Sequence, residues 1–336
     1  SELPLPPRRK TIAYMESMKR EAKPIVCLTA YDYPTGLSIR SADVDLCLVG
    51  DSLANVALGH STTQSISLDV MIHHAQAVQR GLNSSMLVSQ PHLPASPFLV
   101  VDMPFGSFMA SESEAIRNAV KLIQETGADA VKIEGGEEIL GLVRKLTQFG
   151  IPVMGHIGLQ PQRVGSTSGY RVQGRSAVAA AEIYHQAREL EKAGCFSIVL
   201  ECIPWKLAEF ITENLSITTI GIGAGNATDG QVLVVSDMIG ELTSPAHILA
   251  GLSGEGEEAS RSESSSSPPP PSPASHSPSP PKFVRSFTKP WSLGAMRISA
   301  IRDYVEAVRE RRFPENDVEG YKIKPAEFQE FLEIVE

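Results

Sequence analysis

Positive charge is scarce in this 336-residue chain, which argues against one class of partner. Lys and Arg together number 30, against 39 Asp and Glu, so the formal net charge is -9 at pH 7. A nucleic-acid-binding protein needs surplus Lys and Arg to displace counterions from the phosphate backbone. We therefore expect no nucleic-acid partner.

Long apolar runs are also missing. Residues 98–101 and 220–222 are typical of the longest, and both are far shorter than the ~20 residues of a membrane-spanning helix. The basic residues 7–10 are not followed by an apolar segment, which is unlike a secretory signal. We expect a soluble protein without membrane contact. Because residue 1 is Ser, we expect a processed or incomplete N-terminus and a location in the mitochondrial matrix or the cytoplasm.

Cysteine is rare and does not follow a metal-binding pattern. The spacing of the four thiols matches neither CxxC nor a zinc site, so we expect them to be reduced and zinc to be absent. These are Cys27, Cys47, Cys195 and Cys202.

Short apolar runs alternate with longer helical stretches over most of the chain, a rhythm typical of β/α units and a parallel sheet. Eight strands with interleaved helices favour a closed (β/α)8 TIM barrel at residues 25–252, although an open doubly wound sheet gives the same alternation. The predicted strands are residues 25–30, 45–50, 99–102, 130–134, 153–157, 197–201, 219–223 and 232–235. The predicted helices are residues 69–80, 112–126, 137–149, 177–193 and 204–214.

The remaining segments flank the barrel. Helical spacing over residues 11–23 predicts a lead-in helix within an N-terminal segment, residues 1–24. Residues 253–281 are so rich in Ser and Pro that we expect a disordered insert. The C-terminal extension, residues 282–336, is predicted to hold two extra helices outside the barrel core, at residues 296–312 and 325–335.

The third strand is ambiguous. Three prolines make residues 89–97 a loop, and apolar runs at residues 86–88 and 98–101 flank it. We favour the second run because it ends in Asp102.

Five predicted strands have an ionisable residue at or just after their C-terminal end. In a barrel these strand ends converge on the face where active sites lie, so side chains distant in sequence would share one pocket. Any one acid could instead cap the following turn. The five residues are Asp51, Asp102, Glu134, His156 and Glu201.

Three of these residues predict a metal site. Asp51, Asp102 and Glu134 offer oxygen ligands without cysteine, which suits Mg²⁺ and leaves positions for water or substrate. The alternative is that two of them are capping or ion-paired acids and no metal binds.

The other charged residues suggest catalytic roles. Lys132 and Glu134 are two residues apart on one strand and so share a face. One interpretation is a structural ion pair between the two side chains. The other is that Lys132 supplies positive charge to a substrate carboxylate or enolate oxygen. Glu201 precedes mostly apolar residues 202–204, an environment suited to a general base. His156 is a candidate acid or a support behind the metal ligands, and otherwise a hydrogen-bonded barrel-end histidine.

The glycine-rich residues 221–226 do not predict a nucleotide site. The stretch lacks the last glycine of GxGxxG and lies near the seventh strand instead of the first. Its glycines are better explained by close backbone approach at the barrel mouth.

Taken in order, seven short motifs between about residue 11 and residue 240 resemble the ketopantoate hydroxymethyltransferase family. The proline-bearing residues 89–97 and the Ser/Pro insert depart from the family pattern, and neither removes a candidate site residue. The seven motifs are residues 28–32, 49–52, 131–136, 155–159, 169–174, 200–202 and 221–225.

The resemblance implies a magnesium-dependent transferase. Members transfer a hydroxymethyl group from 5,10-methylenetetrahydrofolate to 3-methyl-2-oxobutanoate through a Mg²⁺-stabilised enolate, giving 2-dehydropantoate for pantothenate and coenzyme A synthesis. They are homo-oligomers. The implied roles are Mg²⁺ binding, partly through water, by Asp51, Asp102 and Glu134, substrate contact by Asp51, Ser52, Asp102 and Lys132, and proton acceptance by Glu201.

Two other functions stay open at this point. A carbon–carbon lyase of the phosphoenolpyruvate mutase and isocitrate lyase type would share the barrel, the Mg²⁺ and a 2-oxo acid, but would not need folate. A non-catalytic protein could use residues 272–282 as a polyproline ligand, yet such a protein has no use for five strand-end ionisable groups.

Overall fold

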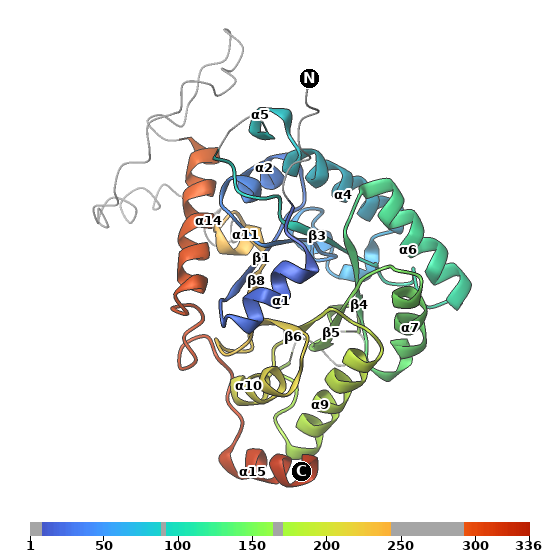
Figure 1. Cartoon of the computed structure of the whole chain (residues 1–336), viewed down its shortest axis with the longest axis vertical. Helices are drawn as coiled ribbons and strands as arrows, with labels where there is room; N and C mark the ends of the chain where they lie inside the picture. The colour runs from blue at the N-terminus through green and yellow to red at the C-terminus, as the bar shows by residue number, and fades with distance from the viewer. Residues whose placement is uncertain (1–8, 89–91, 164–170, 243–291) are drawn as a thin grey trace, which may run out of the picture.

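The computed structural model describes residues 9–88, 92–163, 171–242 and 292–336. Eight parallel strands pair in chain order, and β8 returns to pair with β1, so the sheet closes into a barrel (Figure 1). The predicted (β/α)8 barrel is therefore confirmed and an open sheet is excluded. The strands are β1 (Ile25–Thr29), β2 (Leu46–Val49), β3 (Phe98–Asp102), β4 (Ala130–Glu134), β5 (Val153–Gly158), β6 (Ser197–Glu201), β7 (Thr218–Ile222) and β8 (Gly230–Leu233).

Helices surround the barrel, and their ends follow local sequence signals. In α6 the Ser111 side chain accepts the backbone N–H of Glu114, and Gly127 ends the helix at a φ of 66°. The longer helices of the ring are α2 (Tyr33–Ser41), α4 (Leu68–Leu82), α6 (Glu112–Thr126), α7 (Leu140–Gln148), α9 (Ala177–Lys192) and α10 (Trp205–Asn214). Short turns are α3 (Leu53–Val56), α5 (Ser85–Val88), α11 (Val235–Met238), η1 (Thr63–Ser65), η2 (Glu137–Ile139) and η3 (Pro161–Arg163).

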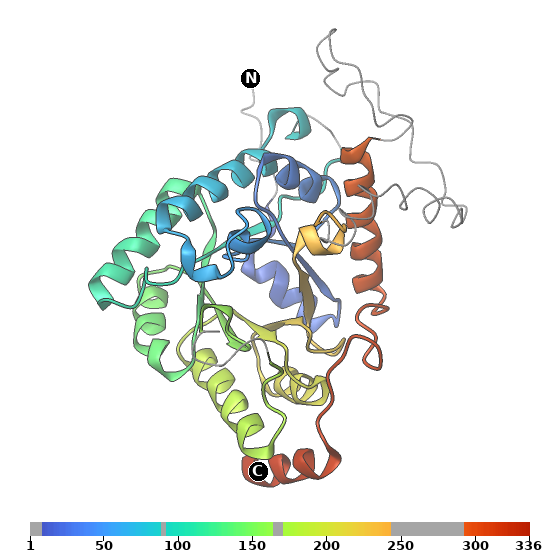
Figure 2. The same ribbon diagram turned by 180° about the vertical axis from the view of Figure 1, so that it is seen from behind.

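The lead-in helix α1 (Ile12–Arg20) closes one end of the barrel. Met15 and Met18 are buried among side chains of the barrel interior, including Ile25 and Leu46. The helix lies on the near side of the molecule in Figure 1 and on the far side in Figure 2, beyond the N-terminal ends of the strands. Only the C-terminal end of the barrel is left to hold a site.

The first C-terminal helix packs on the helical layer and on one strand. Helix α14 (Leu293–Arg309), predicted at residues 296–312, lies against α2 and β1 (Figure 1). The hydroxyl of its buried Tyr304 donates to the carbonyls of Cys27 and Gln231, at 3.0 and 3.1 Å. Helix α14 thus packs on β1, and its Tyr304 also joins β1 to β8.

The last helix, α15 (Pro325–Val335), lies outside the ring. It packs against α9, where Phe331 is fully buried beside Tyr184 and Phe210. The Glu327 carboxylate accepts the N–H of Ala177 at 2.8 Å and so helps to cap α9.

Several details of the chain bear on the sequence predictions. The third strand is the favoured run, while residues 86–88 belong to α5. All four cysteines are free thiols. In the described ranges no helix is long and apolar enough to cross a membrane. The predicted Ser/Pro insert, residues 253–281, and motif residues 169 and 170 lie outside the described residues.

Candidate active site

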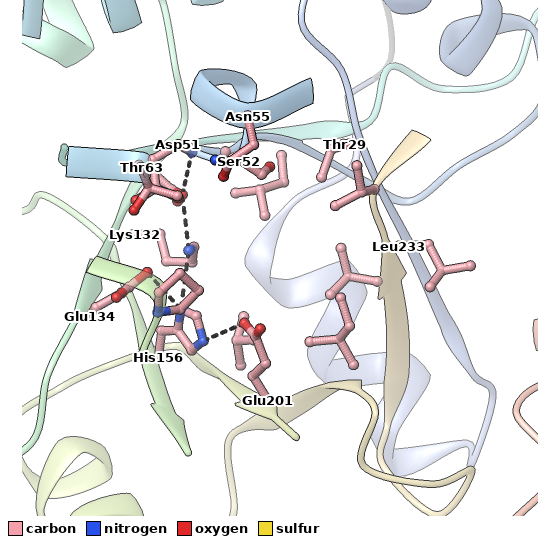
Figure 3. A pocket seen from close by; sticks show the side chains of 18 residues that line it. Thr29, Asp51, Ser52, Asn55, Thr63, Lys132, Glu134, His156, Glu201 and Leu233 are labelled. Atoms are coloured by element: carbon pink, nitrogen blue, oxygen red, sulfur yellow. Dashed lines mark hydrogen bonds and ion pairs between the residues drawn. The ribbon is translucent and has the colours of Figure 1, made fainter. Parts of the chain in front are cut away.

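A pocket of about 180 Å³ opens at the C-terminal ends of the strands (Figure 3). All five predicted strand-end residues line it, because parallel strands in a barrel end on the same face. Ser52 and Lys132 line it as well. The convergent side chains are therefore Asp51, Ser52, Asp102, Lys132, Glu134, His156 and Glu201.

Strand register explains why these side chains touch. On β3 and β4, Asp102 lies beside Lys132, and on β4 and β5, Glu134 lies beside His156. A β-carbon at Gly50 would lie 3.5 Å from Asp102 Oδ2, in van der Waals contact. With hydrogen alone there, the next N–H, that of Asp51, donates to Asp102 Oδ2 at 2.9 Å.

Lys132 forms its ion pair across strands and not along its own strand. Its Nζ lies 3.0 Å from Asp102 Oδ2, whereas the ion pair with Glu134 that the spacing allowed is not formed. Burial lowers the pKa of Lys132, but the carboxylates of Asp102, Glu134 and Asp51 outweigh burial and raise it. Lys132 is therefore a buried permanent cation at the pocket wall.

His156 lies between two carboxylates. Nε2 is 3.0 Å from Glu201 Oε2, and Nδ1 is 3.5 Å from Glu134 Oε1. Burial and the Lys132 charge lower the pKa of His156, but the two carboxylates raise it to about 9. Nδ1 also lies 3.3 Å from Lys132 Nζ, so the ring contacts Lys132 as well as Glu134 and Glu201.

Gln162, on η3, was not identified from the sequence. Its Nε2 donates to Asp51 Oδ2 at 2.8 Å and to the Met103 carbonyl at 3.1 Å. Its backbone N–H donates to Glu134 Oε2 at 3.1 Å. This buried amide links the ends of β2, β3 and β4. An uncharged side chain in a loop carries no sequence signal for such a role.

Ser52 is held from outside the pocket. The hydroxyls of Tyr31 and Ser52 lie 2.8 Å apart, and Tyr31 is buried. The buried phenol thus positions the serine hydroxyl beside the charged wall.

The wall opposite the charges is apolar (Figure 3). Strands β6 to β8 and the turn after them supply it, so the pocket can hold a small molecule with an anionic end and an aliphatic end. The apolar side chains are Val199, Ile222, Val232, Leu233 and Val234.

The charged wall fits a hydrated divalent cation. Two buried carboxylate oxygens, Asp102 Oδ1 and Glu134 Oε1, have no hydrogen-bond partner. Burial and the neighbouring acids raise the pKa of Asp51, a sign of uncompensated negative charge. Within the described chain no three His, Cys, Asp or Glu side chains are grouped tightly enough to hold an ion by themselves. Mg²⁺ commonly takes one or two carboxylates and completes its shell with water and substrate, so the set suits it.

Fold and pocket together define a (β/α)8-barrel enzyme with an acid-rich site at the C-terminal ends of its strands. The chain belongs to the ketopantoate hydroxymethyltransferase family, whose model matches residues 9–250. The family resemblance of the seven motifs is thereby confirmed.

Relatives named 3-methyl-2-oxobutanoate hydroxymethyltransferase align over most of the chain. The protein of Bacillus licheniformis is 40% identical over 94% of this chain and 95% of its own length. That of Salinibacter ruber is 41% identical over 92% and 98%. That of Syntrophus aciditrophicus is 46% identical over 69% and 81%. The chain is thus an enzyme of a transferase family.

Among solved structures, oxaloacetate acetylhydrolase in complex with oxalate matches with a TM-score of 0.52 at 12% identity. The match covers 76% of this chain and 89% of that one. At this identity the likeness concerns the barrel fold alone.

Proposed function

We propose that the enzyme transfers a hydroxymethyl group from 5,10-methylenetetrahydrofolate to 3-methyl-2-oxobutanoate, giving 2-dehydropantoate for pantothenate and coenzyme A synthesis. The observation that carries the proposal is the two-sided pocket, with a charged wall facing an apolar one. The names of the relatives agree with this substrate.

The 2-oxo acid fits the two walls in one orientation. Its carboxylate and ketone face Lys132 and the Ser52 hydroxyl, and its isopropyl group lies on the apolar side. Asp51, Asp102 and Glu134 would hold Mg²⁺, partly through water. When bound, the cation supplies positive charge that makes the C3–H bond next to the ketone more acidic.

Glu201 is the proton acceptor in this proposal. Its carboxylate lines the pocket from the end of β6, next to the apolar wall that receives the isopropyl group. His156 Nε2 lies 3.0 Å from Glu201 Oε2 and so fixes the position of this carboxylate at the pocket wall. Lys132 meanwhile stabilises the negative charge that develops on the substrate oxygen.

Carbon transfer follows deprotonation. C3 forms a bond to the methylene carbon of the folate, the folate nitrogens keep the electron pairs of the two C–N bonds that break, and water supplies the hydroxyl group. Tetrahydrofolate is released. A carbon–carbon lyase would instead cleave a bond without folate.

An assay with each component withheld tests the proposal. We expect formation of 2-dehydropantoate to require the 2-oxo acid, a divalent cation and methylenetetrahydrofolate together. Full turnover after chelation, or without the folate, would contradict it. Cleavage of a C–C bond in the folate-free reaction would favour the lyase.

A further inference from the structure

A second cavity, of about 340 Å³, adjoins the active-site pocket at the ends of β7 and β8. The two cavities share three lining residues, Ile222, Val232 and Leu233. We call it the rim cavity. Its other lining residues are Gly223, Gln231, Asp237, Met238, Phe313, Pro314 and Glu319.

The strand ladder explains why the cavities join here. Strands β7 and β8 pair only at Ile220 with Gly230 and at Gly221 with Gln231. Strands β6 and β7 pair at five positions, up to Glu201 with Ile222. Above Gly221 the ladder between β7 and β8 has ended, so Ile222 and Val232 face both cavities.

The active-site pocket alone is too small for both substrates. Sites for drug-sized ligands enclose about 300–1,000 Å³, and this pocket encloses about 180 Å³. That volume suits a five-carbon acid. The rings of a folate must therefore lie outside it, in a space that reaches the acid.

A third cavity, of about 270 Å³ beside β4 and β5, is a weaker candidate. It shares no lining residue with the active-site pocket. Its Arg163 is already ion-paired with Glu138. Of these two cavities in the described part of the chain, the rim cavity is the one that shares the apolar wall on which the reacting C3 group is placed.

The lining of the rim cavity matches a pteridine ring. Met238, Phe313 and Pro314 offer apolar contact to flat ring faces. Within the described residues the Asp237 carboxylate makes no hydrogen bond or ion pair, whereas that of Glu319 already accepts the N–H of Glu315 at 2.6 Å. The pterin edge carries two parallel donors, N3–H and the 2-amino group, which one carboxylate can accept together.

We propose that the rim cavity binds the pteridine ring of the folate donor, with Asp237 accepting the N3–H and 2-amino hydrogens. This inference rests on the proposed function, which requires a folate. The donor then reaches the 2-oxo acid past Ile222 and Val232, on the side opposite the charged wall.

The Asp237→Asn variant tests the site. Asp237 is exposed, so the variant is expected to keep the thermal transition of the wild type. We expect the KM for methylenetetrahydrofolate to rise on the order of 10-fold or more, because charge-assisted hydrogen bonds are lost. The KM for the 2-oxo acid and its folate-free C3 proton exchange should stay within about twofold of wild type. Glu182→Gln, in the third cavity, is the matched control and should leave all three values unchanged.

Each alternative outcome is decisive. An unchanged folate KM in Asp237→Asn overturns the inference, and so does a raised folate KM in Glu182→Gln alone. Loss of C3 exchange in Asp237→Asn would place Asp237 in the oxo-acid site and also overturn it. If wild-type turnover needs no folate, the proposed function itself fails, whatever the variants do.

Discussion

Nε2 of His156 lies 3.0 Å from Oε2 of Glu201, so the residue proposed as the base contacts the imidazole ring. The other ring nitrogen faces Glu134 at 3.5 Å. One imidazole therefore connects Glu134, a proposed metal ligand, with Glu201, the proposed base. Burial raises the pKa of Glu134, but His156 and Lys132 outweigh burial and lower it.

The first prediction concerns the protonation of His156. Its pKa of about 9 lies above the ordinary value of 6.5, because Glu134 and Glu201 favour the charged ring. A group with a raised pKa stabilises the fold below about pH 6.5, and this contribution is lost as pH rises through about 9. Glu134→Gln should lower the pKa, and NMR of the histidine ring nitrogens measures it. Titration of His156 near 6.5 in the wild type would contradict the assignment.

The second prediction concerns Asp45, at the opposite end of the barrel. Its buried carboxylate lies 2.8 Å from Lys10 Nζ and 2.6 Å from an Arg309 nitrogen. Burial raises the pKa of Asp45, but these two cations outweigh it and lower the pKa. Asp45→Asn leaves Arg309 without its carboxylate and Lys10 with Asp43 alone. It should reduce the free energy of unfolding by about 3–5 kcal/mol, measured by urea denaturation.

The matched control for Asp45 is an exposed ion pair. Asp69 lies 2.6 Å from Lys121 on the surface, and Asp69→Asn should not change stability measurably. Equal stability of the two variants would show that Asp45 is not a structural anchor.

The stabilisation by Asp45 should also depend on pH. Because the pKa of Asp45 is lowered in the folded protein, its carboxylate stabilises the fold at pH values above its ordinary pKa near 3.8. The contribution is lost as pH falls through the lowered pKa of the folded state.

The third prediction concerns Gln162, which holds Asp51 by a 2.8 Å hydrogen bond. Gln162→Leu keeps the side-chain volume but frees the Asp51 carboxylate. Partners that orient metal ligands commonly contribute 10–100-fold to metal affinity. Calorimetric titration with Mg²⁺ should show a loss of about that size. Gln76→Leu, which removes a surface hydrogen bond to Glu125, is the control. Equal Mg²⁺ affinities in both variants would exclude the role.

The alternation of apolar and helical segments was enough to predict the barrel. Strands β4 and β6 begin and end at the predicted residues, since charged or turn residues bound their apolar runs. The convergence of strand-end side chains then follows from parallel strands closing on one face. The location of the five ionisable residues at strand ends was therefore enough to predict that they line one pocket.

Contacts between segments could not be predicted in the same way. Asp102 pairs with Lys132 because the register between β3 and β4 places the two residues side by side. The spacing of residues within one strand gives no information about that register. Gln162 reaches Asp51 across 111 positions of sequence. Helix α14 has an ordinary amphipathic pattern. Such a pattern indicates that one face of the helix is buried, but not which other element covers that face. Its contact with β1 joins segments more than 260 residues apart, which periodicity within the helix cannot indicate.

The central claim is that Glu201 removes the C3 proton of the 2-oxo acid. Glu201→Gln keeps the shape of the side chain but cannot accept a proton at neutral pH. Exchange of the C3 proton with deuterated solvent, followed by NMR with Mg²⁺ and without folate, isolates this step. The variant should keep its affinity for Mg²⁺ and 3-methyl-2-oxobutanoate and lose on the order of 10²–10⁴ in exchange rate. Exchange at the wild-type rate would contradict the claim and point to another base in the pocket.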